Sequence, residues 1–302
     1  MFVWSKVSPV SKQSILEDQF LGLAQTNAVI TEMPGKKRFR IEVYCDDKND
    51  AQKILNEFGG HVSELKIKDW AKMNASSDRP PIKIRDRLII TDKDEPKEIK
   101  KIYDRFEGRD VISIPAALAF GTGDHETTST CLRLLVDLAK EYNKSNEDWS
   151  LCDIGTGTGI LAIAAKMLGS KMVECFDFDS TAISIAKHNI SKNQMPGIVI
   201  YEADLFEWEP KKKKCWDIIT ANIFANVLNA NLSKIFNALA PEGNLILSGI
   251  LSEHENSVIE SAQKTSLIDP IIYRKGKWVS MHYRKKRRAT NDRLSVANFI
   301  GL

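Results

Sequence analysis

Apolar stretches of two lengths alternate over the last two thirds of this 302-residue chain. Short apolar runs of strand length are separated by longer stretches in which apolar residues recur every three or four positions, the spacing of a helix. This alternation predicts an α/β fold, a mostly parallel sheet with helices on both faces. The predicted strands are Leu151–Ile154, Met172–Phe176, Ile198–Tyr201, Trp216–Ala221, Asn244–Ser248 and Trp278–Tyr283, and the predicted helices include Ile160–Leu168, Val227–Leu239 and Glu253–Lys264.

The first 70 residues show a different order of elements. A strand is predicted at Phe2–Val7 and a helix over Ser11–Thr26. Arg38–Cys45 alternates between apolar and polar residues, the period of a half-buried strand. A short helix at Asp50–Phe58 and an alternating strand at Val62–Ile67 follow. This order predicts a small ferredoxin-like α+β domain, in which the sequence offers no catalytic groups.

The polar stretch between the two patterns holds Pro80-Pro81 and one predicted strand at Arg87–Thr91, and a helix is expected over Glu98–Phe106. Pro241-Glu-Gly243 predicts a turn before the strand at Asn244. The predicted divisions are 1–70 for the small domain, 71–97 for a linker and lead-in, 98–288 for the main domain and 289–302 for a C-terminal tail.

A glycine-rich loop, Gly155-Thr-Gly-Thr-Gly159, follows the first strand of the main domain and is followed at once by a helix. Glycine lets a backbone turn sharply and approach a ligand closely. A dinucleotide site has the spacing G-x-G-x-x-G, whereas Ile160 occupies the sixth position here. The spacing G-x-G-x-G is typical of proteins that bind S-adenosylmethionine (SAM), a cofactor without a pyrophosphate.

The next strand ends in Asp177-Phe-Asp179. A carboxylate at this position can accept hydrogen bonds from both ribose hydroxyls of an adenosine, and Asp177 is the candidate. The alternative is that both acids simply belong to the loop and the first turn, which is the simpler interpretation of Asp179. Ser180 is then the expected N-cap of the following helix.

Two further polar stretches are candidates for ligand contact. The loop Ala119–Thr128 carries glycines, threonines and N–H groups that suit the methionine end of SAM, unless Thr127 or Thr128 only caps the next helix. Asn222 falls at the carboxyl end of a predicted central strand, where open α/β sheets bind ligands. Its amide can donate and accept, although an asparagine there is also a common helix cap.

Composition narrows the class of protein. The net charge is only +3, so no overall field calls for a nucleic-acid partner. Basic runs at Lys211–Lys214 and Arg284–Arg288 either contact RNA or a ribosomal surface, or are solvated. Five cysteines without C-x-x-C spacing indicate a reduced, cytoplasmic protein with no metal site. No signal peptide or membrane-spanning run is predicted, and we expect a monomer.

Three of these stretches together resemble the bacterial ribosomal-protein methyltransferases of the PrmA type, which modify large-subunit protein eleven. That family has, in this order, a loop F-G-T-G-x-H-x-T-T, a segment D-x-G-x-G-x-G-x-L-A-I-A-A and a segment A-N-I-x-A-N. The resemblance covers nearly the whole chain. It implies a Rossmann-like class I methyltransferase sheet behind the ferredoxin-like domain, SAM as the cofactor and a ribosomal protein as the partner. The implied cofactor contacts are Thr128, Gly155, Asp177 and Asn222, with Gly157 lining the same site and Asp204 near the adenine amino group.

The chain departs from the family pattern at several positions. Asp124 and Glu126 flank His125 where the family has threonine and proline, Pro115-Ala-Ala117 replaces a usual Asp-Pro-Gly, and Val227 replaces a proline. The two added carboxylates could attract a lysine amine or mark a different protein substrate. The fold and the cofactor do not depend on these positions, whereas the substrate does.

The expected activity is transfer of methyl groups to lysine or N-terminal amines of a large-subunit ribosomal protein, with the first domain docking that protein. No dedicated catalytic triad is expected, since placement of the amine supplies most of the acceleration, and His125 is interpreted as structural rather than as a base. The alternatives are methyl transfer to another protein, RNA or a small molecule, and a SAM-binding or ribosome-associated module without turnover. A nicotinamide oxidoreductase is the remote option.

Overall fold

The computed structural model describes residues 2–9, 12, 27–32, 38–45, 47–64, 80–115, 120–123, 125–210, 215–265 and 267–286. Two compact units divide the chain, Met1–Asp78 and Arg79–Leu302. The predicted helix over 11–26, residues 65–79, Asp124, the run 211–214 and the tail 289–302 lie outside the described residues, Lys12 excepted. Among the described residues, no helix combines the length and the apolar run needed to span a bilayer.

The first unit contains a four-stranded antiparallel sheet with the order β2-β3-β1-β4. The strands are β1 (Phe2–Pro9), β2 (Asn27–Glu32), β3 (Arg38–Cys45) and β4 (His61–Glu64), and the helix is α2 (Lys48–Phe58). The alternation predicted for Arg38–Cys45 is confirmed, because Phe39, Ile41 and Val43 are buried in one cluster with Trp4. The ferredoxin-like topology itself stays a prediction, since its first helix falls outside the described residues.

The second unit begins with a small three-stranded sheet, β5-β6-β7, and one helix. Its elements are β5 (Ile82–Ile84), β6 (Leu88–Thr91), α4 (Pro96–Arg105) and β7 (Asp110–Ser113). Only β6 and the helix were expected from the sequence, and β5 and β7, of three and four residues, were not predicted. The helix begins two residues earlier than predicted, with Pro96 in its first turn, where proline is well tolerated.

The main sheet has seven strands in the order β10-β9-β8-β11-β12-β14-β13. Its strands are β8 (Ser150–Ile154), β9 (Met172–Asp177), β10 (Ile198–Glu202), β11 (Trp216–Asn222), β12 (Leu239–Leu251), β13 (Ile271–Lys275) and β14 (Trp278–Arg284). The five strands from β10 to β12 are parallel, and β14 pairs antiparallel with both β12 and β13. The chain switches direction of winding between β8 and β11, so ligand-binding groups are expected at the carboxyl ends of these strands.

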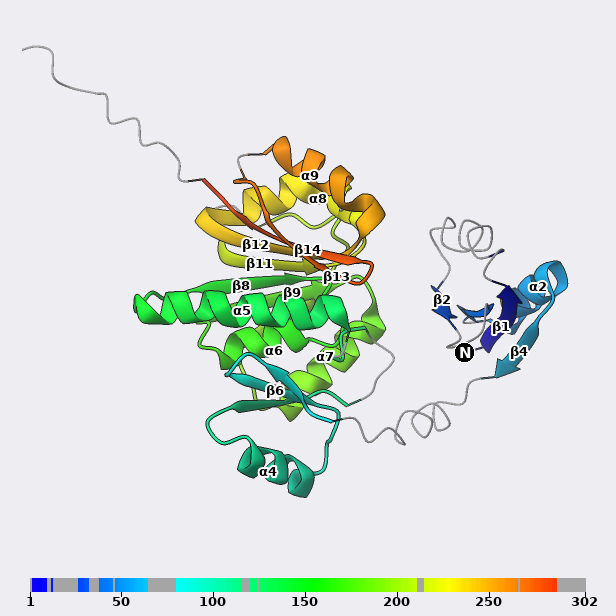
Figure 1. Ribbon diagram of the computed structural model, residues 1–302, viewed down its shortest axis with the longest axis horizontal. Coiled ribbons are helices and arrows are strands. Elements are labelled where there is room, and N and C mark those ends of the chain that lie inside the picture. The colour runs from blue at the N-terminus through cyan, green and yellow to red at the C-terminus, as the bar shows by residue number, and fades with distance from the viewer. Residues whose placement is uncertain are drawn as a thin grey trace, which may run out of the picture. The chain divides into compact units, whose positions relative to one another are not determined.

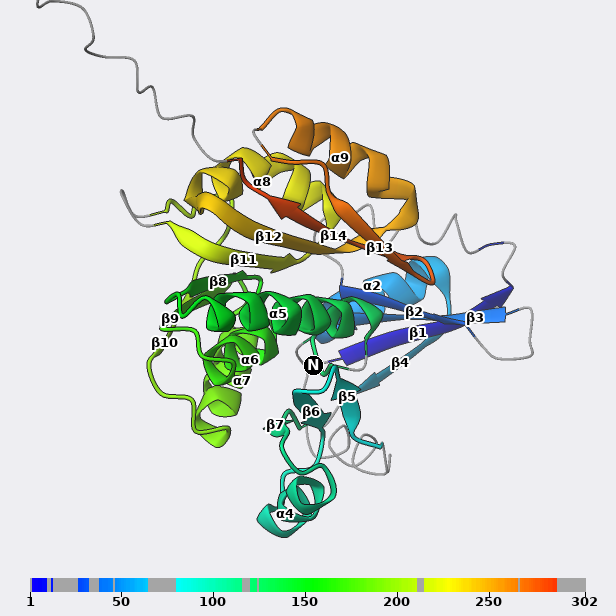
Figure 2. The same ribbon diagram turned by 60° about the vertical axis from the view of Figure 1, so that its left-hand side comes forward.

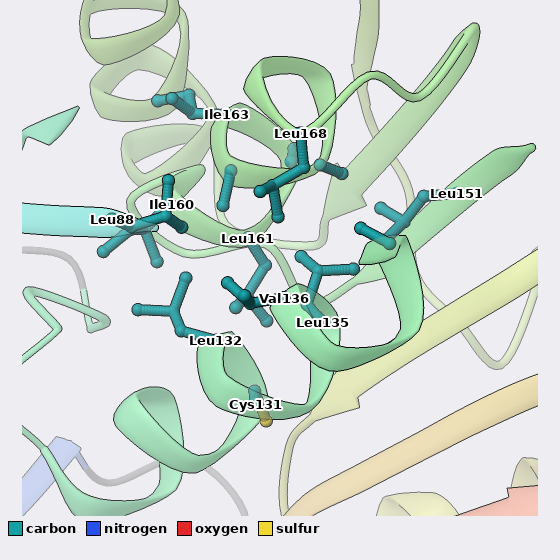
Figure 3. Packing of buried hydrophobic residues seen from close by; sticks show 14 of the residues in the cluster. Leu88, Cys131, Leu132, Leu135, Val136, Leu151, Ile160, Leu161, Ile163 and Leu168 are labelled. Carbon is teal, nitrogen blue, oxygen red and sulfur yellow. The ribbon is translucent and has the colours of Figure 1, made fainter. Parts of the chain in front are cut away.

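Helices cover both faces of this sheet, as predicted (Figure 1). The helices α5 (Glu126–Lys144), α6 (Ile160–Met167) and α7 (Ser180–Lys192) cover one face, and α8 (Ala225–Ala238) and α9 (Glu255–Gln263) cover the other. Figure 2 shows the same two layers from a second direction. Because side chains alternate along a strand, Leu151 packs in the α5–α6 cluster and its neighbour Cys152 packs in the α8–α9 cluster. Figure 3 shows Leu132 and Leu135 of α5 packed beside Leu161 of α6.

The turn predicted at Pro241–Gly243 is part of an irregular strand. Trp216 pairs with Leu239 and Ile218 with Asn244, so the β12 side contains three more residues than the β11 side. Glu242 takes a left-handed φ of 62° within this bulge. Because β12 already begins at Leu239, the preceding helix α8 ends at Ala238, one residue earlier than predicted.

Candidate functional site

The loop after β8 is shaped by hydrogen bonds to the neighbouring strand. The backbone N–H groups of Gly155 and Thr156 both donate to the Phe176 carbonyl at 3.0 Å. Gly155 and Gly157 have φ values of 68° and 55°, which other residues rarely adopt. A Cβ on Gly155 would lie 2.4 Å from a methyl carbon of Ile223, and one on Gly157 would lie 2.3 Å from the Phe120 carbonyl oxygen. Only glycine fits either position.

Asp153, in the strand β8 that leads into the glycine loop, anchors this loop. This role was not predicted from the sequence. Asp153 is buried and accepts hydrogen bonds from the hydroxyls of Thr156 and Thr220, each at 2.6 Å. Burial raises its pKa to about 6 despite the two hydroxyl donors, which lower it. The available signal was an acidic residue inside an apolar strand, which needs partners when it is buried.

Asp177 lies at the end of β9, beside the glycine loop. Its carboxylate accepts from the backbone N–H of Gly157 at 2.9 Å and of Asp179 at 3.1 Å. Burial raises its pKa, and these backbone donors oppose the rise. Asp179 caps α7 through the Thr181 N–H at 2.8 Å, so the expectation that Ser180 is the N-cap is wrong by one residue.

The loop before α5 closes over the glycine loop. The Phe120 carbonyl accepts from the Thr158 N–H at 3.0 Å, and the Thr158 hydroxyl donates to the Gly121 carbonyl. His125 is the N-cap of α5, because its Nδ1 accepts from the Thr127 N–H at 3.4 Å. The alternative in which Thr127 or Thr128 caps the helix is therefore wrong.

His125 also packs edge-to-face between two aromatic rings. The ring centroids lie 4.9 Å from Phe120 and 5.0 Å from Trp278, at the start of β14. The neighbouring Glu126 carboxylate lies against the turn between β13 and β14. A Cβ added to Gly276 in this turn would be 2.8 Å from the Glu126 Oε2. The imidazole and the carboxylate thus contact the turn between β13 and β14, which the sequence did not predict as a hairpin.

Asn222 and Thr128 form a pair across the site. The Asn222 Nδ2 donates to the Thr128 hydroxyl at 3.4 Å, and Thr128 is buried on the first turn of α5. The Asn222 Oδ1 is buried without a hydrogen-bond partner. A buried acceptor in this state suits a ligand that brings a donor, such as an amine.

The five residues predicted for the cofactor thus gather at one edge of the sheet. Gly157 binds Asp177, Thr128 binds Asn222, and Gly155 lies against Ile223, the residue after Asn222. The close approach of Ile223 to Gly155 and of Phe120 to Gly157 keeps the glycine loop packed against its neighbours. Two described members of the second basic run bond the backbone: Arg284 donates to the Glu242 carbonyl, and Lys285 donates to the Phe236 and Leu239 carbonyls.

Several known proteins are similar to this chain in sequence and in fold. The profile of the ribosomal protein L11 methyltransferase (PrmA) family matches residues 10–286. A ribosomal protein L11 methyltransferase of Macrococcus caseolyticus is 32% identical over 249 residues, which are 82% of this chain and 74% of that protein. Its counterpart in Ruminiclostridium cellulolyticum is 32% identical over 261 residues, 81% of this chain and 78% of that protein. The crystal structure of a ribosomal protein L11 methylase from Lactobacillus delbrueckii subsp. bulgaricus matches with a TM-score of 0.55 and 26% identity, covering 68% of this chain and 99% of that one.

Proposed function

Because this chain belongs to the ribosomal protein L11 methyltransferase family, we propose that it transfers methyl groups from SAM to lysine or N-terminal amines of ribosomal protein L11. The chain is a SAM-dependent methyltransferase by its family. The substrate protein and the kind of amine are the proposed part. The names of the relatives support ribosomal protein L11 as the substrate, and the kind of amine is our own proposal.

The observation that carries the proposal is the pairing of Asn222 with Thr128, which leaves Asn222 Oδ1 without a partner beside the glycine loop. The pair would hold the methionine end of the cofactor, whose amine supplies the missing donor. Asp177 would hold the ribose hydroxyls, and Asp204, two residues after the end of the adjacent strand β10, would accept from the adenine amino group. When bound, SAM supplies an electrophilic methyl group on a cationic sulfur.

The chain's own residues have to place and desolvate the amine. An amine must be neutral to act as a nucleophile, and the ordinary lysine pKa is about 10.4. A site that excludes water and holds a cation nearby lowers that pKa. Placement alone contributes about 7–11 kcal/mol in favourable cases, so no general base is needed. His125 is committed to the N-cap and to two aromatic contacts.

The first unit, Met1–Asp78, is proposed to dock the protein substrate. The described part of its sheet and helix carries a hydrophobic core of its own around Trp4 and Phe39. Deleting residues Met1–Trp70 is expected to abolish methylation of protein while SAM binding persists. A folded truncation that loses both would contradict docking.

The direct test of the substrate is labelled methyl transfer from SAM in a lysate that lacks this activity, with the labelled band identified by mass spectrometry. Label on ribosomal protein L11 supports the proposal. Label on another protein or on RNA would keep the fold and the cofactor but overturn the substrate. SAM binding without any label would favour a module that has lost turnover.

A further inference from the structure

The strand β10 lies next to β9, which ends in Asp177, and a single turn follows β10. Glu202 pairs with Asp177 in the parallel register, and the Ala203 N–H donates to the Asp177 carbonyl at 2.9 Å. Asp204 starts the turn: its Oδ1 accepts from the Phe206 N–H at 2.9 Å, and its carbonyl accepts from the Trp208 N–H at 2.7 Å. The conformation of this turn therefore fixes where the Asp204 carboxylate lies.

Lys234, on α8, clamps the same turn. Its Nζ donates to the carbonyls of Leu205 at 3.0 Å and Phe206 at 2.8 Å. Glu209 lies farther away, at 3.9 Å, and its side chain is 80% exposed, so that ion pair contributes little. An ammonium group has three donors, and two of them hold consecutive carbonyls of one turn. Lys234 thus restrains the backbone directly after Asp204.

The site residues follow the order of the strands along the sheet edge. Asn222 ends β11, the glycine loop follows β8, Asp177 ends β9 and Asp204 follows β10, and these four strands are neighbours. A ligand with its ribose at Asp177 and its methionine end toward Asn222 has its base on the β10 side. The 6-amino group of adenine is a donor, whereas an ionised carboxylate only accepts. Asp204 is therefore suited to select a 6-amino purine over a 6-oxo purine.

We infer that Lys234 is a positioning residue for this selection: by holding the turn that carries Asp204, it makes the site prefer adenine to hypoxanthine. The inference rests on the proposed function, which supplies the orientation of the cofactor. Lys234 contacts the turn rather than the base, so its removal acts through Asp204.

The test measures by calorimetry how tightly the full chain binds S-adenosylhomocysteine and S-inosylhomocysteine. These two compounds differ at the 6-position of the purine. The variants are Lys234→Met, Asp204→Ala and Lys285→Met. Lys285→Met is the matched control, because Lys285 also donates to two backbone carbonyls, those of Phe236 and Leu239 at the C-terminal end of α8, instead of to Leu205 and Phe206. Thermal unfolding of each variant separates folding from selectivity.

The wild type is expected to bind the adenosyl compound at least about tenfold more tightly, since a site built around a hydrogen bond rejects the analogue that lacks the donor. Lys234→Met and Asp204→Ala are expected to reduce this ratio to within about threefold. Lys285→Met lowers the melting temperature and leaves the ratio unchanged. If Lys234→Met does not fold, Lys234→Ala carries the same test.

An unchanged ratio in Lys234→Met, or equal binding of the two compounds by the wild type, would overturn this inference and leave the proposed function standing. A ratio that falls equally in Lys285→Met would also overturn it, because general loosening of α8 would then explain the effect. Failure of the wild type to bind either compound would instead contradict the cofactor on which the proposed function depends.

Discussion

The Asn222 amide donates to the Thr128 hydroxyl across 3.4 Å and joins two residues that are 94 positions apart in the chain. This contact ties the end of β11 to the first turn of α5 and leaves the Asn222 Oδ1 buried and unpartnered. An unsatisfied buried acceptor costs about 1–3 kcal/mol. A ligand donor that reaches Oδ1 recovers this cost, and we therefore propose that the pair contributes to cofactor affinity.

Replacing Asn222 by alanine is therefore expected to weaken binding of S-adenosylhomocysteine by about 10- to 100-fold, the equivalent of one or two charge-assisted hydrogen bonds. Titration calorimetry measures the change. Asn237→Ala is the control, because Asn237 is an exposed asparagine on α8 that lies outside the A-N-I-x-A-N segment. Equal affinities for the wild type and Asn222→Ala would show that Asn222 does not touch the cofactor.

Gly157→Ala is expected to disrupt the loop for two reasons. The left-handed φ costs about 1–2 kcal/mol for a residue with a Cβ, and that Cβ would lie 2.3 Å from the Phe120 carbonyl oxygen, which adds about 1–3 kcal/mol. Binding of S-adenosylhomocysteine should fall by at least about tenfold as the loop shifts.

Gly108→Ala separates the two effects, because Gly108 has a φ of 76° and no atom within 4 Å of the added Cβ. It should lose only about 1–2 kcal/mol of unfolding free energy and keep its affinity. Equal losses of unfolding free energy in the two variants, measured by urea unfolding, would refute the close contact at Gly157.

The buried Asp153 predicts a pH dependence of stability. Its pKa is raised from 3.8 to about 6, so the folded chain binds more protons than the unfolded chain between these values. Its contribution to stability is then full below pH about 4 and is lost as the pH rises through about 6. The difference between these two pKa values corresponds to about 3 kcal/mol of unfolding free energy.

Urea unfolding between pH 4 and 8 of the wild type and Asp153→Asn tests this. The unfolding free energy of the wild type, relative to the variant, should fall by about 2–3 kcal/mol between pH 4 and 7. A difference that stays constant across this range would mean that Asp153 keeps its ordinary pKa in the folded chain.

His125→Ala is expected to lower the free energy of unfolding and to leave the rate of methyl transfer unchanged. Loss of the N-cap costs about 0.5–2 kcal/mol, and each lost aromatic contact about 0.5–1.5 kcal/mol. The turnover of saturating substrate and its pH profile should remain those of the wild type. His125→Asn, which can still cap α5, should recover part of the stability. A pH profile that loses one ionisation in both variants would instead identify His125 as a base.

Much of the main domain is predictable because its signals are local. The strand, glycine loop and helix from Leu151 to Leu168 are contiguous, and the period of the apolar residues identifies them without tertiary information. Phe39, Ile41 and Val43 are buried as their alternation requires. The hairpin of β13 and β14 was missed because Ile271–Lys275 is short and its tip is defined by contact with α5.

The connections between distant residues are not predictable from one sequence. Asp153 meets Thr220 across 67 positions and Lys234 meets Phe206 across 28. Each of these side chains has other common uses, and only the packed sheet decides among them. The N-cap of α5 illustrates the point, since threonine is the better cap in general, yet His125 is placed there by the rings of Phe120 and Trp278.

The most direct test of the central claim is methyl transfer by the purified chain to purified, unmethylated ribosomal protein L11, followed by mass spectrometry of the product peptides. The account predicts methyl groups on lysine or N-terminal amines, and a loss of transfer in Asn222→Ala at cofactor concentrations that saturate Asn237→Ala. Tight binding of S-adenosylhomocysteine with no methyl group on any amine of that protein would contradict it.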